Sequence, residues 1–97
     1  MSVLVDFSIF PLDKGESVHH QVARAVGIIR DSGLPYRIGP MGTCIEGEYD
    51  QVMGVVRQCF EELRRDCGRI SLNLRLDYRS QGRGRMESKV RAVESSR

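Results

Sequence analysis

The stretch of the chain best suited to chemistry is residues 40–48, Pro-Met-Gly-Thr-Cys-Ile-Glu-Gly-Glu. The hydroxyl of Thr43 and the carboxylate of Glu46 can hydrogen-bond a small polar molecule. Gly42 has no Cβ, so another group can approach its backbone closely. We expect Thr43 and Glu46 to lie side by side at a corner that leads into a helix, next to a gap opened by glycine. The alternative is a purely structural hairpin, with a buried threonine and a glutamate at the helix entry.

Hydrophobic periodicity predicts the elements that must position this stretch. Two segments alternate between apolar and polar residues, which is typical of strands with one buried face. Two others carry apolar residues at three- and four-residue steps, which is typical of amphipathic helices. In chain order we expect a strand at 3–10, a helix at 18–32, strands at 36–39 and 43–46, a helix at 48–65, a strand at 69–79 and a short helix at 86–94.

This order predicts an α+β protein with the ferredoxin-like βαββαβ arrangement. Two helices would cover one face of a four-stranded antiparallel sheet. Residues 1–79 would form this domain, and residues 80–97 a flexible link and a short helix that packs on the same domain or on a neighbouring subunit. The other sheet face would be polar, carrying Asp6, Ser8, Asn73, Arg75 and Asp77.

Composition narrows the classes of function. A chain of 97 residues is one small domain, and its limited core favours oligomerisation. The net charge of +2 is too mild to predict nucleic-acid binding, and no run approaches the roughly 18 apolar residues of a membrane span. Three cysteines without a CxxC motif indicate reduced thiols in a cytoplasmic protein, and no signal peptide is evident.

Catalytic and metal sites are poorly supported. His19 and His20 would point about 100° apart on a helix, so they are badly placed to share a metal. A triad of Ser17, His20 and Asp13 would lack a nucleophile elbow. We therefore expect no metal, no cofactor and no enzymatic activity. The polar sheet face with Thr43 and Glu46 remains, and it suits either a small ligand such as an aminopyrimidine or a subunit interface.

Several motifs together resemble the small thiamine-binding protein family. They are Phe10-Pro11, Val22-Ala23, Ser32-Gly33-Leu34-Pro35-Tyr36, Pro40-Met41-Gly42-Thr43, Glu46-Gly47-Glu48, Asp77 with Arg79, and residues 89–94. The resemblance implies a ferredoxin-like subunit that forms dimers or tetramers and binds thiamine or its hydroxymethylpyrimidine part without catalysis. Carried over by motif, the site candidates are Ser32, Tyr36, Met41, Gly42, Thr43 and Glu46; strand alternation adds Asp6 and Ser8.

The leading hypothesis is therefore a cytoplasmic homo-oligomer that binds thiamine or a related pyrimidine. Glu46 or Asp6 would accept from the amino group or pair with the thiazolium, so loss of Glu46 is predicted to weaken binding. Thr43 and Ser8 would orient the ring, and Tyr36 or Met41 would supply apolar contact. The second hypothesis is a structural or regulatory oligomer whose polar sheet face is an interface.

Overall fold

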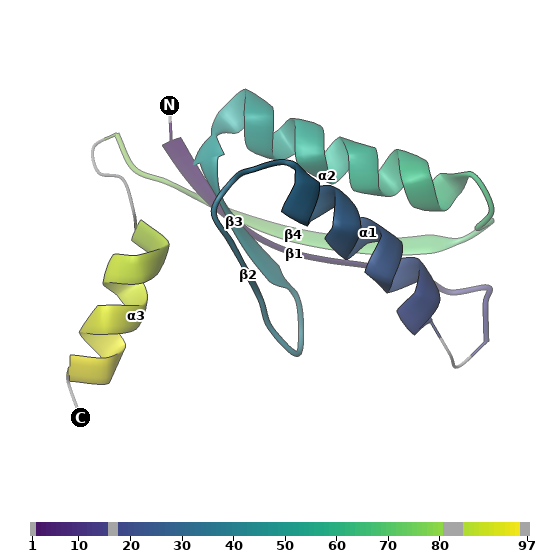
Figure 1. Ribbon diagram of the computed structural model, residues 1–97, viewed down its shortest axis with the longest axis horizontal. Coiled ribbons are helices and arrows are strands. Elements are labelled where there is room, and N and C mark those ends of the chain that lie inside the picture. The colour runs from purple at the N-terminus through teal and green to yellow at the C-terminus, as the bar shows by residue number, and fades with distance from the viewer. Residues whose placement is uncertain (1, 16–17, 81–84, 96–97) are drawn as a thin grey trace.

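The structure is a computed structural model that describes residues 2–15, 18–80 and 85–95 (Figure 1). Its elements are β1 (Ser2–Pro11), α1 (His19–Asp31), β2 (Tyr36–Ile38), β3 (Thr43–Glu48), α2 (Tyr49–Arg64), β4 (Ile70–Tyr78) and α3 (Arg85–Ser95). The strands form one antiparallel sheet in the order β2-β3-β1-β4. This arrangement confirms the predicted α+β, ferredoxin-like fold.

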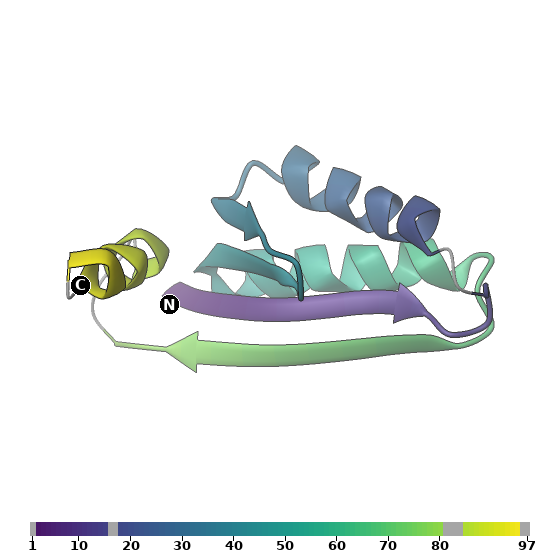
Figure 2. The ribbon, with the colours of Figure 1, turned by 90° about the horizontal axis from the view of Figure 1, so that it is seen from below.

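Strand alternation determines which face is buried. Every second residue of β1, from Val3 to Ile9, is buried, and the intervening ones are partly exposed. Figure 2 shows α1 and α2 together on one side of the sheet. The buried side chains of β1 form one core with Ile45 of β3 and with the inner stripe of α2, which includes Val52 and Leu63. None of the described helices covers most of the other sheet face, which we call the helix-free face (Figure 2).

One arginine joins the two covering helices. The guanidinium of Arg24 on α1 donates to the Glu62 carboxylate at 3.2 Å and to the Asp66 carboxylate at 2.9 Å, just beyond α2. Hydrogen bonds from Arg65 and Arg24 lower the pKa of Glu62, and the bond from Arg24 lowers the pKa of Asp66. The contacts fix the lateral position of α1, which forms one wall of the site described below.

Unequal strand lengths leave a gap beside β1. β3 pairs with β1 only from Ser2↔Glu48 to Phe7↔Thr43, whereas β4 pairs with β1 as far as Pro11. Among the described strands, none pairs with residues 8–11 on the β3 side. Side chains from α1 and from the β2–β3 turn line a cavity there.

The C-terminal helix lies at the end of the sheet where β1 begins, away from α1 and α2 (Figures 1 and 2). Met86 is buried, and the Lys89 ammonium pairs with the Asp77 carboxylate at 2.7 Å. Val93, in contrast, is exposed. The predicted division into residues 1–79 and 80–97, and a role for α3 at a neighbouring subunit, stay predictions.

One local prediction changes, and two others concern residues outside the described ranges. The third strand does not end at Glu46, because β3 continues through Gly47 to Glu48 before α2 begins. Ser17, which precedes the helix predicted at 18–32, lies outside the described residues, and Val18 occupies the N-cap position of α1 without a side-chain hydrogen bond. Residues 81–84, predicted to be flexible, also lie outside the described ranges.

Candidate functional site

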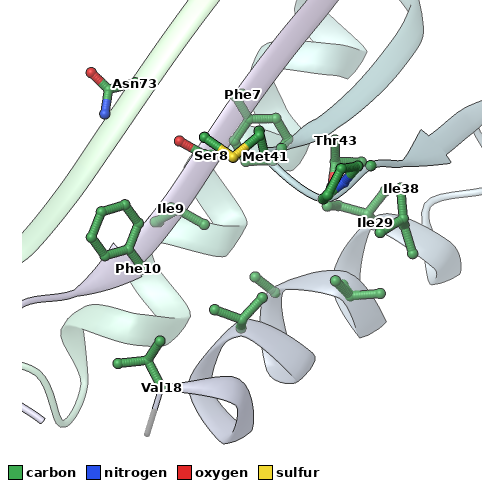
Figure 3. A pocket seen from close by; sticks show the side chains of 16 residues that line it. Phe7, Ser8, Ile9, Phe10, Val18, Ile29, Ile38, Met41, Thr43 and Asn73 are labelled. Carbon is green, nitrogen blue, oxygen red and sulfur yellow. The ribbon is translucent and has the colours of Figure 1, made fainter. Parts of the chain in front are cut away.

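A cavity of about 510 Å³ occupies the gap between α1, the exposed edge of β1 and the β2–β3 turn (Figure 3). We call it the α1 pocket. Thr43, Ile29 and Ile38 lie toward one end, and Phe10 and Val18 toward the other (Figure 3). Its walls are largely apolar, and its polar side chains are Ser8, Thr43 and Asn73. A volume of this size, with few polar groups, is typical of sites for small organic molecules.

A tight turn brings Met41 and Gly42 to the pocket. The backbone N–H of Gly39 donates to the carbonyl of Gly42 at 2.8 Å, which places Pro40 and Met41 at the tip of the turn. Proline suits this position because its φ angle is already fixed. The Met41 side chain is 89% exposed at the pocket mouth and lies beside Ser8. It is a flexible apolar group that a ligand can cover.

Thr43 and Glu46 do not lie side by side, so the expected arrangement of hydroxyl and acid is wrong. Thr43 pairs with Phe7 and faces the helices, whereas Glu46 pairs with Leu4 and faces the opposite side of the sheet. Successive strand residues alternate between faces, and positions three apart therefore point in opposite directions. Thr43 is only 7% exposed and lines the α1 pocket.

Glu46 lies instead at the start of the C-terminal helix. Its carboxylate is buried, with 6% of the residue exposed, and Oε1 accepts a hydrogen bond from the backbone N–H of Met86 at 3.3 Å. The first N–H groups of a helix have no partner within the helix, and its N-terminus favours negative charge. Glu46 therefore anchors α3 to β3, and it lines no part of the α1 pocket.

Ser32 and Tyr36 also lie outside the α1 pocket. The Ser32 hydroxyl donates to the carbonyl of Ile29 at 2.6 Å and accepts from the N–H of Leu34 at 3.2 Å, which closes the end of α1. Tyr36 pairs with Ile45 and packs against the hydrophobic core. Both residues hold the chain entering β2 rather than facing the cavity.

Asp6 and Ser8 border a second cavity, of about 380 Å³, on the helix-free face of the sheet. We call it the open-face hollow; its polar members are Asp6, Ser8, Asn73 and Arg75. The Cys44 thiol donates to Oδ1 of Asp6 at 3.6 Å, and Nη2 of Arg75 lies 3.7 Å from Oδ2. Burial, reinforced by the nearby Asp6 carboxylate, raises the pKa of Cys44.

Four of the eight predicted residues thus converge on the α1 pocket: Ser8, Met41, Gly42 and Thr43. The site residues predicted from the sequence do not include Val22 and Val26 of α1, which line the opposite wall of the pocket. An apolar stripe at helical spacing is typical of a face that packs in the core, so it gives no sign of a binding site. The available signal was the mismatch between the long first strand and the short third strand. That mismatch leaves part of the stripe without a strand to cover.

Among the described residues, no three His, Cys, Asp or Glu side chains lie close enough together to hold a metal ion. In the same part of the chain, no helix is long and apolar enough to cross a bilayer. The three cysteines are unpaired, and burial raises the pKa of Cys59 to about 11.

Comparisons with known proteins agree on one family. The family model described as "Thiamine-binding protein" matches residues 5–94. A UPF0045 protein of Mycobacterium bovis is 41% identical over 95 residues, covering 97% of this chain and 93% of that protein. A UPF0045 protein of Eremothecium gossypii is 33% identical over 97 residues, covering 97% and 91%.

Two solved structures share the fold closely. A hypothetical protein of Methanocaldococcus jannaschii superposes with a TM-score of 0.89 at 28% identity, covering 96% of each chain. A Thermotoga maritima protein, whose name provisionally assigns it to thiamine biosynthesis or salvage, gives a TM-score of 0.84 at 29% identity and covers 96% of this chain and 99% of that one.

Proposed function

Since this chain belongs to the thiamine-binding protein family, we propose that it binds thiamine, or the hydroxymethylpyrimidine part of thiamine, in the α1 pocket without catalysing a reaction. The observation that carries the proposal is this cavity, whose largely apolar wall carries the buried Thr43. Family membership supports the proposed class of ligand, and the geometry of the pocket supports its proposed position.

The pocket suits a flat aminopyrimidine ring. Apolar side chains such as Phe10, Val22 and Val26 offer contact to the ring faces. The Thr43 hydroxyl both donates and accepts, which matches a ring nitrogen beside an amino group. The edge of β1 at residues 8–11 has no described strand partner on this side, so backbone groups there are available to a ligand as well.

Asp6 provides a counter-charge for the thiazolium cation. Its side chain is 45% exposed on the helix-free face, and the nearest guanidinium, that of Arg75, is 3.7 Å away. This distance exceeds a hydrogen bond, and exposed pairs of this kind contribute little stability. A cationic ring near Ser8 and Met41 would therefore gain an electrostatic contact at small cost. The thiol of Cys44 is a poor nucleophile there, because its raised pKa disfavours the thiolate.

Assembly into a homo-oligomer, a dimer or tetramer, is part of the proposal. β4 lies at the edge of the sheet, and its outer side faces no described strand. Leu72, Leu76 and Tyr78 of β4 are exposed. An unpaired edge strand with exposed apolar residues favours association with a second chain. A cytoplasmic location is also proposed, and the three unpaired thiols support it.

Calorimetry with thiamine and with hydroxymethylpyrimidine tests the proposal, using wild type and Val26→Phe. The larger side chain fills the α1 pocket, so affinity should fall at least about tenfold, since a blocked ring loses most of its apolar contact. The matched control Val93→Phe, at an exposed position of α3, should bind like wild type. Absence of heat with both ligands at roughly millimolar concentration would overturn the proposal.

A further inference from the structure

The α1 pocket and the open-face hollow adjoin each other. Both cavities are lined by Phe7, Ser8, Met41 and Asn73. Ser8 and Asn73 are direct partners across β1 and β4, and Met41 lies beside Ser8 (Figure 3). A ligand whose ring occupies the α1 pocket can therefore extend past Ser8 and Met41 onto the helix-free face.

The hollow lies next to a row of charged and polar side chains that crosses all four strands. Strand register places Arg37, Cys44, Asp6 and Arg75 side by side, from β2 through β3 and β1 to β4. Two cations thus flank one carboxylate and one thiol. The thiol is neutral because its pKa is raised, so the row carries a net positive charge.

Arg75 is the cation of this row that lines the hollow. Its side chain is 88% exposed, and its ion pair with Asp6 spans 3.7 Å. Such a loose, exposed pair is weak, so the guanidinium can turn toward a ligand at little cost. Guanidinium groups match phosphate oxygens well, since they present several N–H donors in one plane. Ser8 and Asn73 add a hydroxyl and an amide donor at the same hollow.

We propose that the open-face hollow is a phosphate subsite, and that the protein prefers a phosphate ester of its heterocyclic ligand, held by Arg75, over the unphosphorylated form. The inference rests on the proposed function, because the ring must first occupy the α1 pocket. A ligand with a cationic ring and an anionic arm would replace both partners of the Asp6–Arg75 pair. Neither side chain would then be left without a counter-charge.

The test compares thiamine with thiamine monophosphate by calorimetry, in wild type, Arg75→Gln and Arg79→Gln. Arg79 follows the same strand and is also exposed, so it controls for the loss of one positive charge. In wild type the phosphate ester should bind about fivefold more tightly or better, as expected for a partly exposed charge-assisted contact. This preference should vanish in Arg75→Gln and persist in Arg79→Gln, and Arg75→Lys should restore part of it.

The outcomes separate this inference from the proposed function. Equal affinities for the two compounds in wild type, or a preference unchanged in Arg75→Gln, would overturn the phosphate subsite while leaving thiamine binding intact. Failure of both compounds to bind would overturn both proposals. Inorganic phosphate is a second probe, and it should weaken binding of thiamine monophosphate more than binding of thiamine.

Discussion

Gly42 and Phe7 approach each other so closely that a methyl group on Gly42 would lie 2.9 Å from the Phe7 carbonyl oxygen. The same methyl group would come within 3.4 Å of the Asp6 carboxylate. The turn that carries Met41 is therefore pressed directly against β1, at the point where the pairing between β1 and β3 ends. This contact sets the position of the pocket mouth.

Replacing Gly42 by alanine should displace the turn, because the Phe7 carbonyl belongs to a paired strand and cannot move easily. We expect the free energy of unfolding to fall by about 1–3 kcal/mol, as for other overpacked sites. Chemical denaturation measures this directly. The matched control is Gly54→Ala within α2, where an added methyl meets nothing within 4 Å. It should be neutral or stabilising, by up to about 1 kcal/mol. Equal effects of the two changes would contradict the close contact.

Thr43→Val removes the buried hydroxyl of the α1 pocket and keeps the side-chain shape. If this hydroxyl bonds the ligand ring, affinity for hydroxymethylpyrimidine should fall about threefold to tenfold, the usual effect of one neutral hydrogen bond. Thr43→Ser keeps the hydroxyl and should retain most of the affinity. Calorimetry on the three proteins measures the difference. A valine variant with wild-type affinity would show that Thr43 serves packing only.

Glu46→Ala should loosen α3 and leave the ligand site intact. The Glu46 carboxylate accepts a hydrogen bond from the backbone N–H of Met86 at 3.3 Å. Loss of such a contact at a helix N-terminus typically lowers the stability of the helix by about 0.5–2 kcal/mol. Amide hydrogen exchange across residues 86–94 should accelerate severalfold, while thiamine affinity should change less than twofold. If Glu46→Ala instead lowers thiamine affinity tenfold and leaves amide exchange in α3 unchanged, then Glu46 contributes to ligand binding and not to the anchoring of α3.

The Arg24 contacts predict a specific dependence of stability on pH. Because Glu62 and Asp66 have pKa values below their ordinary values of 4.5 and 3.8, the unfolded chain binds more protons in this range. Their contribution is therefore present at neutral pH and is lost as the pH falls through and below those values. Arg24→Gln should reduce the loss of stability between pH 7 and about pH 3. Urea unfolding at both pH values measures it.

Arg57→Gln is the control for the Arg24 experiment. Arg57 is an exposed arginine of α2, so its replacement removes one positive charge and leaves the Arg24 contacts in place. The acid sensitivity of this variant should match wild type. If Arg24→Gln and Arg57→Gln lose equal stability on acidification, then the overall charge of the protein, and not the contacts of Arg24 with Glu62 and Asp66, determines the dependence of stability on pH.

The architecture follows from local patterns, and the site does not. Period-two strands and the two helical stripes were sufficient to predict the ferredoxin-like order, since each pattern states which face is buried. The expected proximity of Thr43 and Glu46 is wrong because both residues lie in one strand, β3, which continues past Glu46 to Glu48. Side chains three positions apart in a strand point to opposite faces, and the predicted strand 43–46 already implied this.

Other features of the site depend on long-range geometry. The contact between Glu46 and Met86 joins residues 40 positions apart, and no local motif encodes it. The α1 pocket exists because β3 stops pairing at Thr43 while β1 continues to Pro11. The sequence shows both strand lengths, but the register that aligns them arises only on folding. Four of the predicted site residues nevertheless line this pocket.

The most direct test of the central claim is a titration of the isotopically labelled protein with thiamine, followed by amide chemical shifts. Binding in the α1 pocket predicts that the largest shifts fall on residues 8–10, 22–29 and 38–43. Residues around Ser32 and Glu46 should change little. Shifts confined to residues 31–34 and 46–48, with residues 38–43 unaffected at saturation, would contradict the assignment of the ligand to the α1 pocket.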